Sequence, residues 1–197
     1  QAERGIELEF IPVTEDGLLD LDTYKSLLDR RPKLVSFTHM SNVLGTINPA
    51  AEIIRLAHEA GAITLVDGAQ SVPHLKVDMQ ALDADFYAFS AHKMCWPTGI
   101  GALYGKSALL ESMPPFLGGG DMIKEVKLRS FRPNTLPHKF EAGTPAIAEA
   151  VGFGVAVDYL SAVGMERIAA HEHEITEYAL DRLEEIPGVK LFGPSAD

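Results

Sequence analysis

Three short apolar segments, separated by helix-forming segments and each followed by a polar loop, constrain the fold more than any other feature of this sequence. The apolar segments at 33–38, 62–66 and 86–89 have the length of buried strands. Between the first two, Pro49 opens a helical segment and Gly61 ends it. Strands that alternate with helices form a parallel sheet, because each crossover connection packs a helix against the sheet. The sequence therefore predicts a layered sheet-and-helix domain.

The predicted fold class is α/β, with a mostly parallel sheet and helices on both faces. Residues 1–163 are assigned to this large domain. Residues 164–197 are assigned to a linking helix and to the first strand, at 189–192, of a C-terminal α+β domain. A further strand is expected at 6–13.

A long apolar segment follows Thr144. We expect Thr144 to cap a helix that has Pro145 at its first position and runs to about residue 161. Apolar residues occur on nearly every face of this helix, and a helix of that kind is either buried or lies at an interface. The segment is therefore suited to a homodimer contact.

Charge and composition exclude several classes of function. The chain has 197 residues, of which 46% are hydrophobic, and a mean hydropathy of +0.04, which is typical of a globular protein in water. Its 17 basic and 28 acidic residues give a net charge of −11, whereas nucleic-acid binding requires clustered lysine and arginine. No apolar run is long enough to cross a bilayer. We expect a cytoplasmic protein with no nucleic-acid or membrane partner, and the single cysteine argues against a disulfide or a cysteine-rich metal site.

Polar residues follow the end of each predicted strand. The carboxyl ends of parallel strands meet at one edge of a sheet, where ligands bind, so these loops are expected to converge. Taken in chain order, the polar residues of the three loops are Asn42, Asp67, Gln70, Ser90, His92 and Lys93.

The residue types in these loops suit a particular chemistry. A lysine at the tip of a strand, beside the hydroxyl of Ser90 and the imidazole of His92, is suited to forming a Schiff base next to a bound phosphate. Asp67, at the end of an apolar strand, could face a protonated ring nitrogen. The alternatives are ordinary: Lys93 as a solvated surface charge, Asp67 as a turn former, and Ser90 and His92 as polar loop residues.

Five segments carry a resemblance to a known family. They are HMSNVLGTINP at 39–49, LVDGAQSVPH at 65–74, DFYAFSAHKM at 85–94, PTGIGALYGK at 97–106 and FEAGTP at 140–145. In these segments the chain resembles the SufS-type (group II) cysteine desulfurases, which belong to the class V branch of the aspartate-aminotransferase fold and use pyridoxal 5'-phosphate (PLP). The resemblance extends over essentially the whole chain.

The resemblance implies a role for each loop residue. Lys93 matches the lysine that binds PLP covalently and then acts as a general base on the substrate α-carbon. Asp67 matches the carboxylate that pairs with the pyridine nitrogen, and Gln70 the donor to the phenolic oxygen of the cofactor. Ser90 and His92 match phosphate ligands.

Two further residues and the partners follow from the same resemblance. Asn42 matches an asparagine close to the cofactor and the substrate carboxylate. Thr144 matches a residue that reaches the cofactor phosphate of the partner subunit in a homodimer. The implied substrate is L-cysteine, which is converted to L-alanine and an enzyme-bound persulfide, and a sulfur-acceptor protein would pass the sulfur to iron–sulfur cluster assembly.

The sequence departs from the family pattern at two positions after Lys93, and several motifs of the family are absent from residues 1–197. Cys95 is expected to be a packing residue, since the family nucleophile lies on a loop much closer to the C-terminus. Trp96 stands where the family has glycine, which places the turn after Lys93 in question. The upstream phosphate loop and stacking histidine and the downstream cysteine and arginine are absent from these residues, so we expect residues 1–197 alone to release no alanine from L-cysteine.

Two other interpretations remain open from the sequence. A different class V enzyme, such as a selenocysteine lyase, kynureninase or epimerase, would contain an equivalent lysine and aspartate. A non-catalytic excised domain that serves in dimerisation or partner binding would not need either residue to react.

Overall fold

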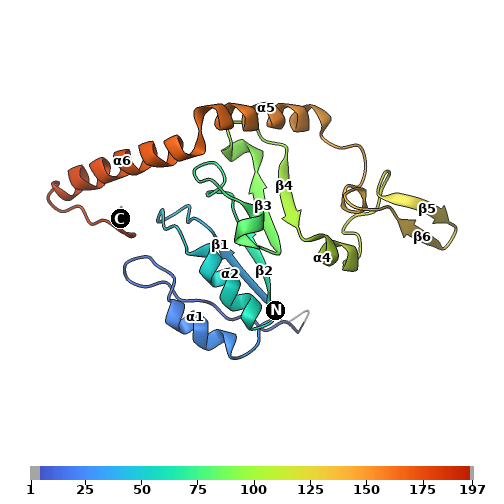
Figure 1. Ribbon diagram of the computed structural model, residues 1–197, viewed down its shortest axis with the longest axis horizontal. Coiled ribbons are helices and arrows are strands. Elements are labelled where there is room, and N and C mark those ends of the chain that lie inside the picture. The colour runs from blue at the N-terminus through green and yellow to red at the C-terminus, as the bar shows by residue number, and fades with distance from the viewer. Residues whose placement is uncertain (1–4, 196–197) are drawn as a thin grey trace.

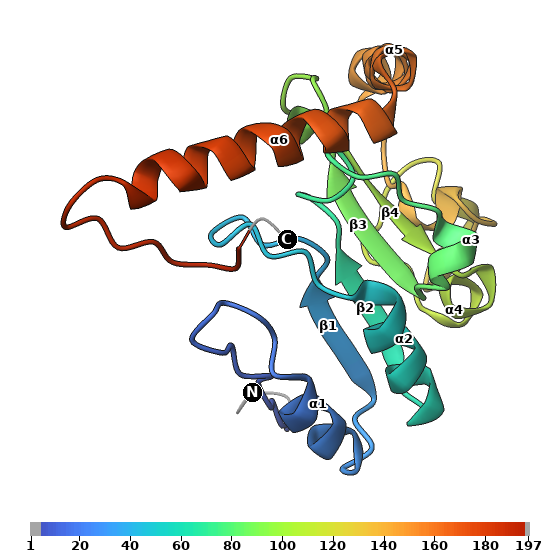
Figure 2. The same cartoon turned by 60° about the vertical axis from the view of Figure 1, so that its left-hand side comes forward.

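A computed structural model describes residues 5–195, in which a four-stranded sheet packs against helices (Figures 1 and 2). The main elements, in chain order, are α1 (Leu21–Leu28), β1 (Leu34–Thr38), α2 (Ala50–Glu59), β2 (Ile63–Asp67), α3 (Met79–Leu82), β3 (Phe86–Ser90), β4 (Gly101–Gly105), α4 (Ser107–Ser112), β5 (Ile123–Lys127), β6 (Ser130–Pro133), α5 (Ile147–Val163) and α6 (Met165–Glu184). Short 3₁₀ turns occur at Ala91–Lys93 and His138–Phe140.

The main sheet has the strand order β1-β2-β3-β4. β1, β2 and β3 are parallel to one another, and β4 returns antiparallel to β3. The register pairs Thr38 with Asp67 and Asp67 with Ala88 across the three parallel strands. The expected α/β class with a mostly parallel sheet is therefore confirmed. β5 and β6 form a separate two-stranded hairpin, which Figure 1 shows at the far end of the molecule from α6.

The core lies between the sheet and helices α1 and α2, and Figure 2 shows α1 near the lower end of β1 and α2 beside β2. Alternate residues of each strand face this layer because successive side chains of a strand point to opposite faces. Val35 and Val66 are buried there against Ile53 of α2. The opposite face of the sheet contains exposed side chains in the described residues, including Leu34 and Leu103, which is 57% exposed.

Two expected strands are wrong. Residues 6–13 form no strand apart from an isolated antiparallel bridge between Val13 and Leu19, and residues 189–192 have no strand structure. A strand requires a neighbour for its backbone hydrogen bonds. In the described part of the chain, neither segment lies beside a sheet edge that pairs with it.

The expected start of the long helix is also wrong. α5 begins at Ile147, and its N-cap residue is Ala146, which makes no side-chain capping bond. Thr144 lies in the irregular connection before the helix. The helix therefore begins two residues after Pro145, and neither Thr144 nor Pro145 belongs to its first turn.

α5 presents an apolar stripe to solvent. Its buried residues are only Gly152, Ala156 and Leu160, whereas Ile147, Val151, Val155 and Tyr159 are all at least 60% exposed. These four residues are four apart, so they lie on one side of the helix. The apolar composition of α5 therefore corresponds to two sides of the helix. One side packs against the rest of the protein, and the other is uncovered in this chain.

A bend of 69° separates α5 from α6, next to the boundary expected between residues 163 and 164. The division into two domains remains a prediction. α6 is tied back to the loop after β2 by two contacts, His74 Nδ1 to Glu172 at 2.7 Å and Lys76 Nζ to Glu166 at 2.9 Å. Among the described helices none alone has the length and apolarity to span a bilayer, although the bent pair α5–α6 meets that test on length and composition.

A buried carboxylate joins the elements at the amino end of β3. Asp85 Oδ2 accepts hydrogen bonds from the Thr64 N–H at 2.8 Å and lies 2.8 Å from His58 Nε2 of α2. Its other oxygen is 2.9 Å from Lys106 Nζ. Burial alone would raise the pKa of Asp85, but the bonds from Lys106, Thr64 and His58 outweigh it and leave that pKa below its ordinary value. The carboxylate therefore joins α2, β2 and the residue after β4.

Asp85→Asn is expected to destabilise the protein by about 1.5–3 kcal/mol at pH 7, because the charged hydrogen bonds are lost in a buried place. A carboxyl whose folded-state pKa is lowered contributes stability that is complete above its unfolded value, about pH 4, and lost as the pH falls through the folded value. Urea denaturation followed by circular dichroism should show the difference between wild type and variant shrinking below pH 4.

Asp83→Asn is the matched control. Asp83 also contacts Lys106, at 2.7 Å, but its side chain is largely exposed, so the cost should stay below about 1 kcal/mol. Equal losses in the two variants would contradict a special role for the buried carboxylate.

Candidate functional site

The loops that follow β1, β2 and β3 converge at the carboxyl edge of the sheet. The His39 N–H donates to the Asp67 carbonyl at 2.8 Å, and the Gly68 N–H donates to the Ala88 carbonyl at 2.8 Å. The side chains of Gln70 and Asn42 are joined by a hydrogen bond from Gln70 Nε2 to Asn42 Oδ1. The expected convergence is therefore present for the loops that contain Asn42, Asp67 and Gln70.

Asp67 is the last residue of β2, and its carboxylate is exposed. Val66 faces the core, so the alternation of the strand turns Asp67 toward the opposite face of the sheet. Its Oδ1 accepts one hydrogen bond, from the Ala69 N–H at 2.9 Å. The carboxylate is thus oriented by its own turn, with lone pairs left for a ligand that donates a proton.

Ser90 ends β3, and His92 and Lys93 lie on the 3₁₀ turn that follows. The turn is anchored from beneath by buried Ala91 and Met94: the Ala91 N–H donates to the Ile100 carbonyl at 3.1 Å, and the Met94 N–H donates to the Ala91 carbonyl at 2.8 Å. His92 is exposed, and Ser90 and Lys93 are half-buried. A hydroxyl, an imidazole and an amine therefore occur together one strand away from Asp67.

Thr144 comes from a different part of the chain. It is exposed in the connection before α5, and it is not joined to the other six residues by a hydrogen bond of the kind that links Gln70 with Asn42. Its expected contact with a partner subunit remains a prediction.

The turn after Lys93 is closed by an aromatic contact with α5. Trp96 packs so tightly on Gly152 that a Cβ atom at that glycine would collide with the indole ring. Nearby, the rings of Phe89 and Phe153 lie 6.3 Å apart. The sequence left open whether a bulky Trp96 could fit in the turn after Lys93. It fits because the facing residue of α5, Gly152, has no side chain.

Cys95 departs from expectation. It is exposed and has a left-handed backbone with φ of 60°, so the expectation that it is a packing residue is wrong. The tight turn needed to bring Trp96 onto α5 turns Cys95 outward. In the described residues no group of three histidine, cysteine, aspartate or glutamate side chains is placed to hold a metal ion.

Sequence reasoning missed a buried polar group beneath this edge. The Tyr87 hydroxyl lies 2.5 Å from Ser71 Oγ and 2.8 Å from His39 Nδ1. Burial raises the pKa of Tyr87 and lowers the pKa of His39, so both rings are neutral at pH 7. A tyrosine at a core-facing position of a central strand, with a histidine and a serine in neighbouring loops, was the available signal.

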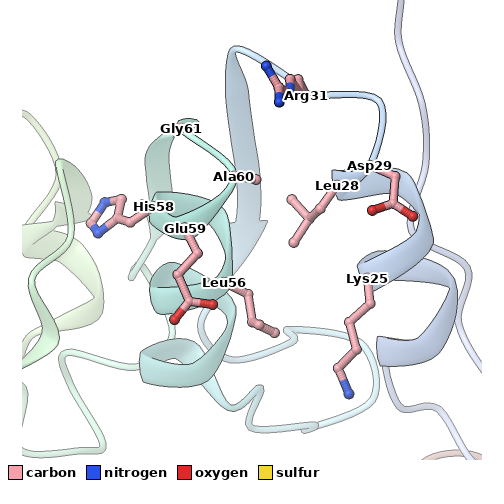
Figure 3. A pocket seen from close by; sticks show the side chains of 9 residues that line it. All are labelled: Lys25, Leu28, Asp29, Arg31, Leu56, His58, Glu59, Ala60 and Gly61. Carbon is pink, nitrogen blue, oxygen red and sulfur yellow. The ribbon is translucent and has the colours of Figure 1, made fainter.

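A pocket of about 660 Å³ lies elsewhere, between the C-terminal ends of α1 and α2 (Figure 3). Figure 3 shows Lys25 of α1 and Asp29, which follows α1, on one side of it and Leu56 and Glu59 of α2 on the other. Because α2 leads into the amino end of β2, the pocket is at the opposite end of that strand from Asp67. None of the residues expected to form the site lines it.

Comparison with known proteins places the chain in a family. The model of the family described as aminotransferase class-V matches residues 1–197. The chain belongs to the class-V aminotransferase family. This class-V chain is 55% identical over 192 residues to a cysteine desulfurase of Dickeya dadantii, with 97% of the chain and 47% of the relative covered.

Solved structures of other proteins have the same fold. The apo structure of a cysteine desulfurase from Thermococcus onnurineus NA1 matches with a TM-score of 0.90 and 38% identity, covering 98% of this chain and 48% of that one. A mutant of C-DES with glycine covalently linked to its PLP cofactor matches with a TM-score of 0.86 and 26% identity, covering 99% and 53%. The chain spans about half the length of these relatives.

Gly152→Ala is expected to destabilise the protein by about 1–3 kcal/mol, because the new methyl group overpacks against Trp96. Gly154→Ala is the matched control on the same helix: nothing lies within 4 Å of its added Cβ, so it should stabilise the protein by about 0.5–1 kcal/mol through helix propensity. Thermal unfolding checks both.

A double-mutant cycle completes the test. Trp96→Gly should remove most of the cost of Gly152→Ala, since the colliding ring is gone. Additive effects of the two substitutions would show that the indole ring does not rest on the glycine.

Proposed function

We propose that the protein to which this chain belongs is a PLP-dependent cysteine desulfurase of the SufS type, which converts L-cysteine to L-alanine and leaves the sulfur as an enzyme-bound persulfide. One observation carries the proposal. Asp67 ends β2 as a free carboxylate on the uncovered face of the sheet, and the adjacent strand leads into Ser90, His92 and Lys93. The 55% identity to a named cysteine desulfurase favours this chemistry over other class-V reactions.

The donor set fits the cofactor. A phosphate dianion requires hydroxyl, imidazole and N–H donors, and Ser90 and His92 supply the first two from one turn. A pyridinium nitrogen requires a carboxylate with a free lone pair, and Asp67 has one because only the Ala69 N–H is bonded to it. Gln70 and Asn42 are joined to each other by a hydrogen bond, and Gln70 belongs to the loop that follows Asp67.

Each residue then has a defined task. PLP, when bound, supplies an electron sink for the substrate electrons. Lys93 would hold the cofactor through its Nζ and would take the proton from the substrate α-carbon. Asp67 would keep the ring nitrogen protonated, and Gln70 would donate to the phenolic oxygen. Asn42 would orient the substrate carboxylate.

Assembly and cellular role are part of the same proposal. The protein is a cytoplasmic homodimer in which Thr144 reaches the cofactor phosphate of the other subunit, and it delivers sulfur to an acceptor protein for iron–sulfur cluster assembly. The exposed apolar stripe of α5, which includes Val151 at 68% exposure, supports a subunit contact on that side. The net charge of −11 supports the absence of a nucleic-acid partner.

The test uses the full-length protein with added PLP. We expect a visible absorption band, fixed by borohydride reduction on the peptide that contains Lys93, and release of alanine from L-cysteine. Lys93→Ala should remove the band and lower alanine production by at least about 10²–10⁴-fold, the contribution of a positioned base.

Lys25→Ala, at an exposed lysine on α1, is the control and should change neither readout. Reduction of the label onto another lysine, or a full rate in Lys93→Ala, would overturn the assignment. A lysine-bound band without alanine release would instead favour another class-V reaction.

A further inference from the structure

A buried chain of three polar side chains lies directly beneath the carboxyl edge of the sheet. Its centre is the Tyr87 hydroxyl, which belongs to a side chain that is 0% exposed. Ser71 Oγ is 2.5 Å from this hydroxyl, and His39 Nδ1 is 2.8 Å from it. Each member comes from a different strand or from the loop that follows it, so the chain crosses from β1 to β3 underneath the loop of β2.

The hydrogen-bond direction can be assigned from the acceptor at one end. Ser71 Oγ donates to the Gly68 carbonyl at 3.2 Å, so it accepts from the Tyr87 hydroxyl. The Tyr87 oxygen then accepts from His39 Nδ1–H, which makes the histidine the neutral Nδ1–H tautomer. Burial, which lowers the pKa of His39, agrees with a neutral ring. Both hydroxyl protons, those of Tyr87 and Ser71, therefore have an acceptor.

The same three residues also hold the backbone that follows Asp67. Gly68 rests on the Tyr87 ring so closely that a Cβ atom there would collide with it, and its carbonyl is bonded to Ser71. The backbone N–H of His39 donates to the Asp67 carbonyl at 2.8 Å. Ser71 and His39 therefore bond to the two peptide groups that follow Asp67, and Tyr87 supports the glycine between these groups.

We propose that Tyr87 is a positioning residue that, through Ser71 and His39, fixes the direction in which Asp67 presents its carboxylate to the cofactor ring nitrogen. This inference rests on the proposed function, because it assigns the carboxylate its ligand. A hydrogen bond to a charged group depends strongly on direction. Asp67 is exposed and makes one bond of its own, so its aim depends on the backbone beneath it.

Tyr87→Phe removes only the hydroxyl and leaves the ring that supports Gly68. His39 Nδ1 and Ser71 Oγ then lose their shared partner, and the loop from Asp67 to Ser71 relaxes. We expect the dissociation constant for PLP to rise by about tenfold. The midpoint pH of the change in the absorption of the lysine-bound cofactor should move upward by about half a unit, because a less positive ring nitrogen withdraws fewer electrons.

Tyr24, elsewhere in the protein, provides a matched control. This tyrosine is as deeply buried, and its hydroxyl donates to the Ile53 carbonyl at 2.8 Å, far from the site. Tyr24→Phe should lower the melting temperature about as much as Tyr87→Phe, yet leave the PLP dissociation constant and the midpoint pH unchanged. A merely structural role for Tyr87 would make the two variants alike.

A second readout is independent of the cofactor. In the full-length protein without PLP, amide hydrogen exchange at Gly68 and Ala69 should be faster in Tyr87→Phe than in wild type, and unchanged in Tyr24→Phe. Ser71→Ala, which breaks the same chain one residue further along, should reproduce the effect if Tyr87→Phe does not fold.

The outcomes separate the two proposals. If wild type takes up no lysine-bound PLP, the proposed function fails, and the exchange rates decide whether Tyr87 holds the Asp67 loop. If wild type binds PLP but Tyr87→Phe matches Tyr24→Phe in affinity, midpoint and exchange, the positioning role is wrong. Faster exchange with altered affinity and midpoint in Tyr87→Phe alone supports it.

Discussion

The parallel pairing of β1, β2 and β3 is the constraint on which the rest of this structure depends. Pairing in register places Thr38, Asp67 and Ala88 in one row across the sheet. The loops that follow must therefore start within a few ångströms of one another. Residues that are about 25 positions apart in sequence become neighbours without any direct attraction between their side chains. Backbone hydrogen bonding between the strands therefore brings the polar side chains together at the carboxyl edge of the sheet.

The two ends of the same strands are built in different ways. At the amino end of β3, Asp85 is buried and its charge is satisfied by Thr64, His58 and Lys106, so it contributes to rigidity. At the carboxyl end of β2, Asp67 is exposed and only lightly bonded. The first carboxylate is fully committed to the fold, and the second remains available. This contrast separates a structural acid from one suited to binding a ligand.

The sheet and its polar edge could be predicted because both follow from local patterns. Apolar segments of strand length, with Pro49 and Gly61 as helix signals, were sufficient for β1 to β3 and α2. The strands expected at 6–13 and 189–192 failed because pairing depends on a neighbour that a local pattern does not reveal. The contact of Trp96 with Gly152 and the buried Tyr87 group were equally out of reach, since each joins elements through tertiary packing.

The indole that closes the turn after Lys93 has an optical consequence. Trp96 is the chain's one tryptophan, and it lies three positions from the amine assigned to the cofactor. Its ring nitrogen is buried and has no hydrogen-bond partner among the described atoms. Ultraviolet emission from this chain therefore originates mainly beside that amine, where a chromophore that absorbs in the near ultraviolet would quench it by energy transfer. The fluorescence of Trp96 would therefore report whether a chromophore is bound beside Lys93, without any added label.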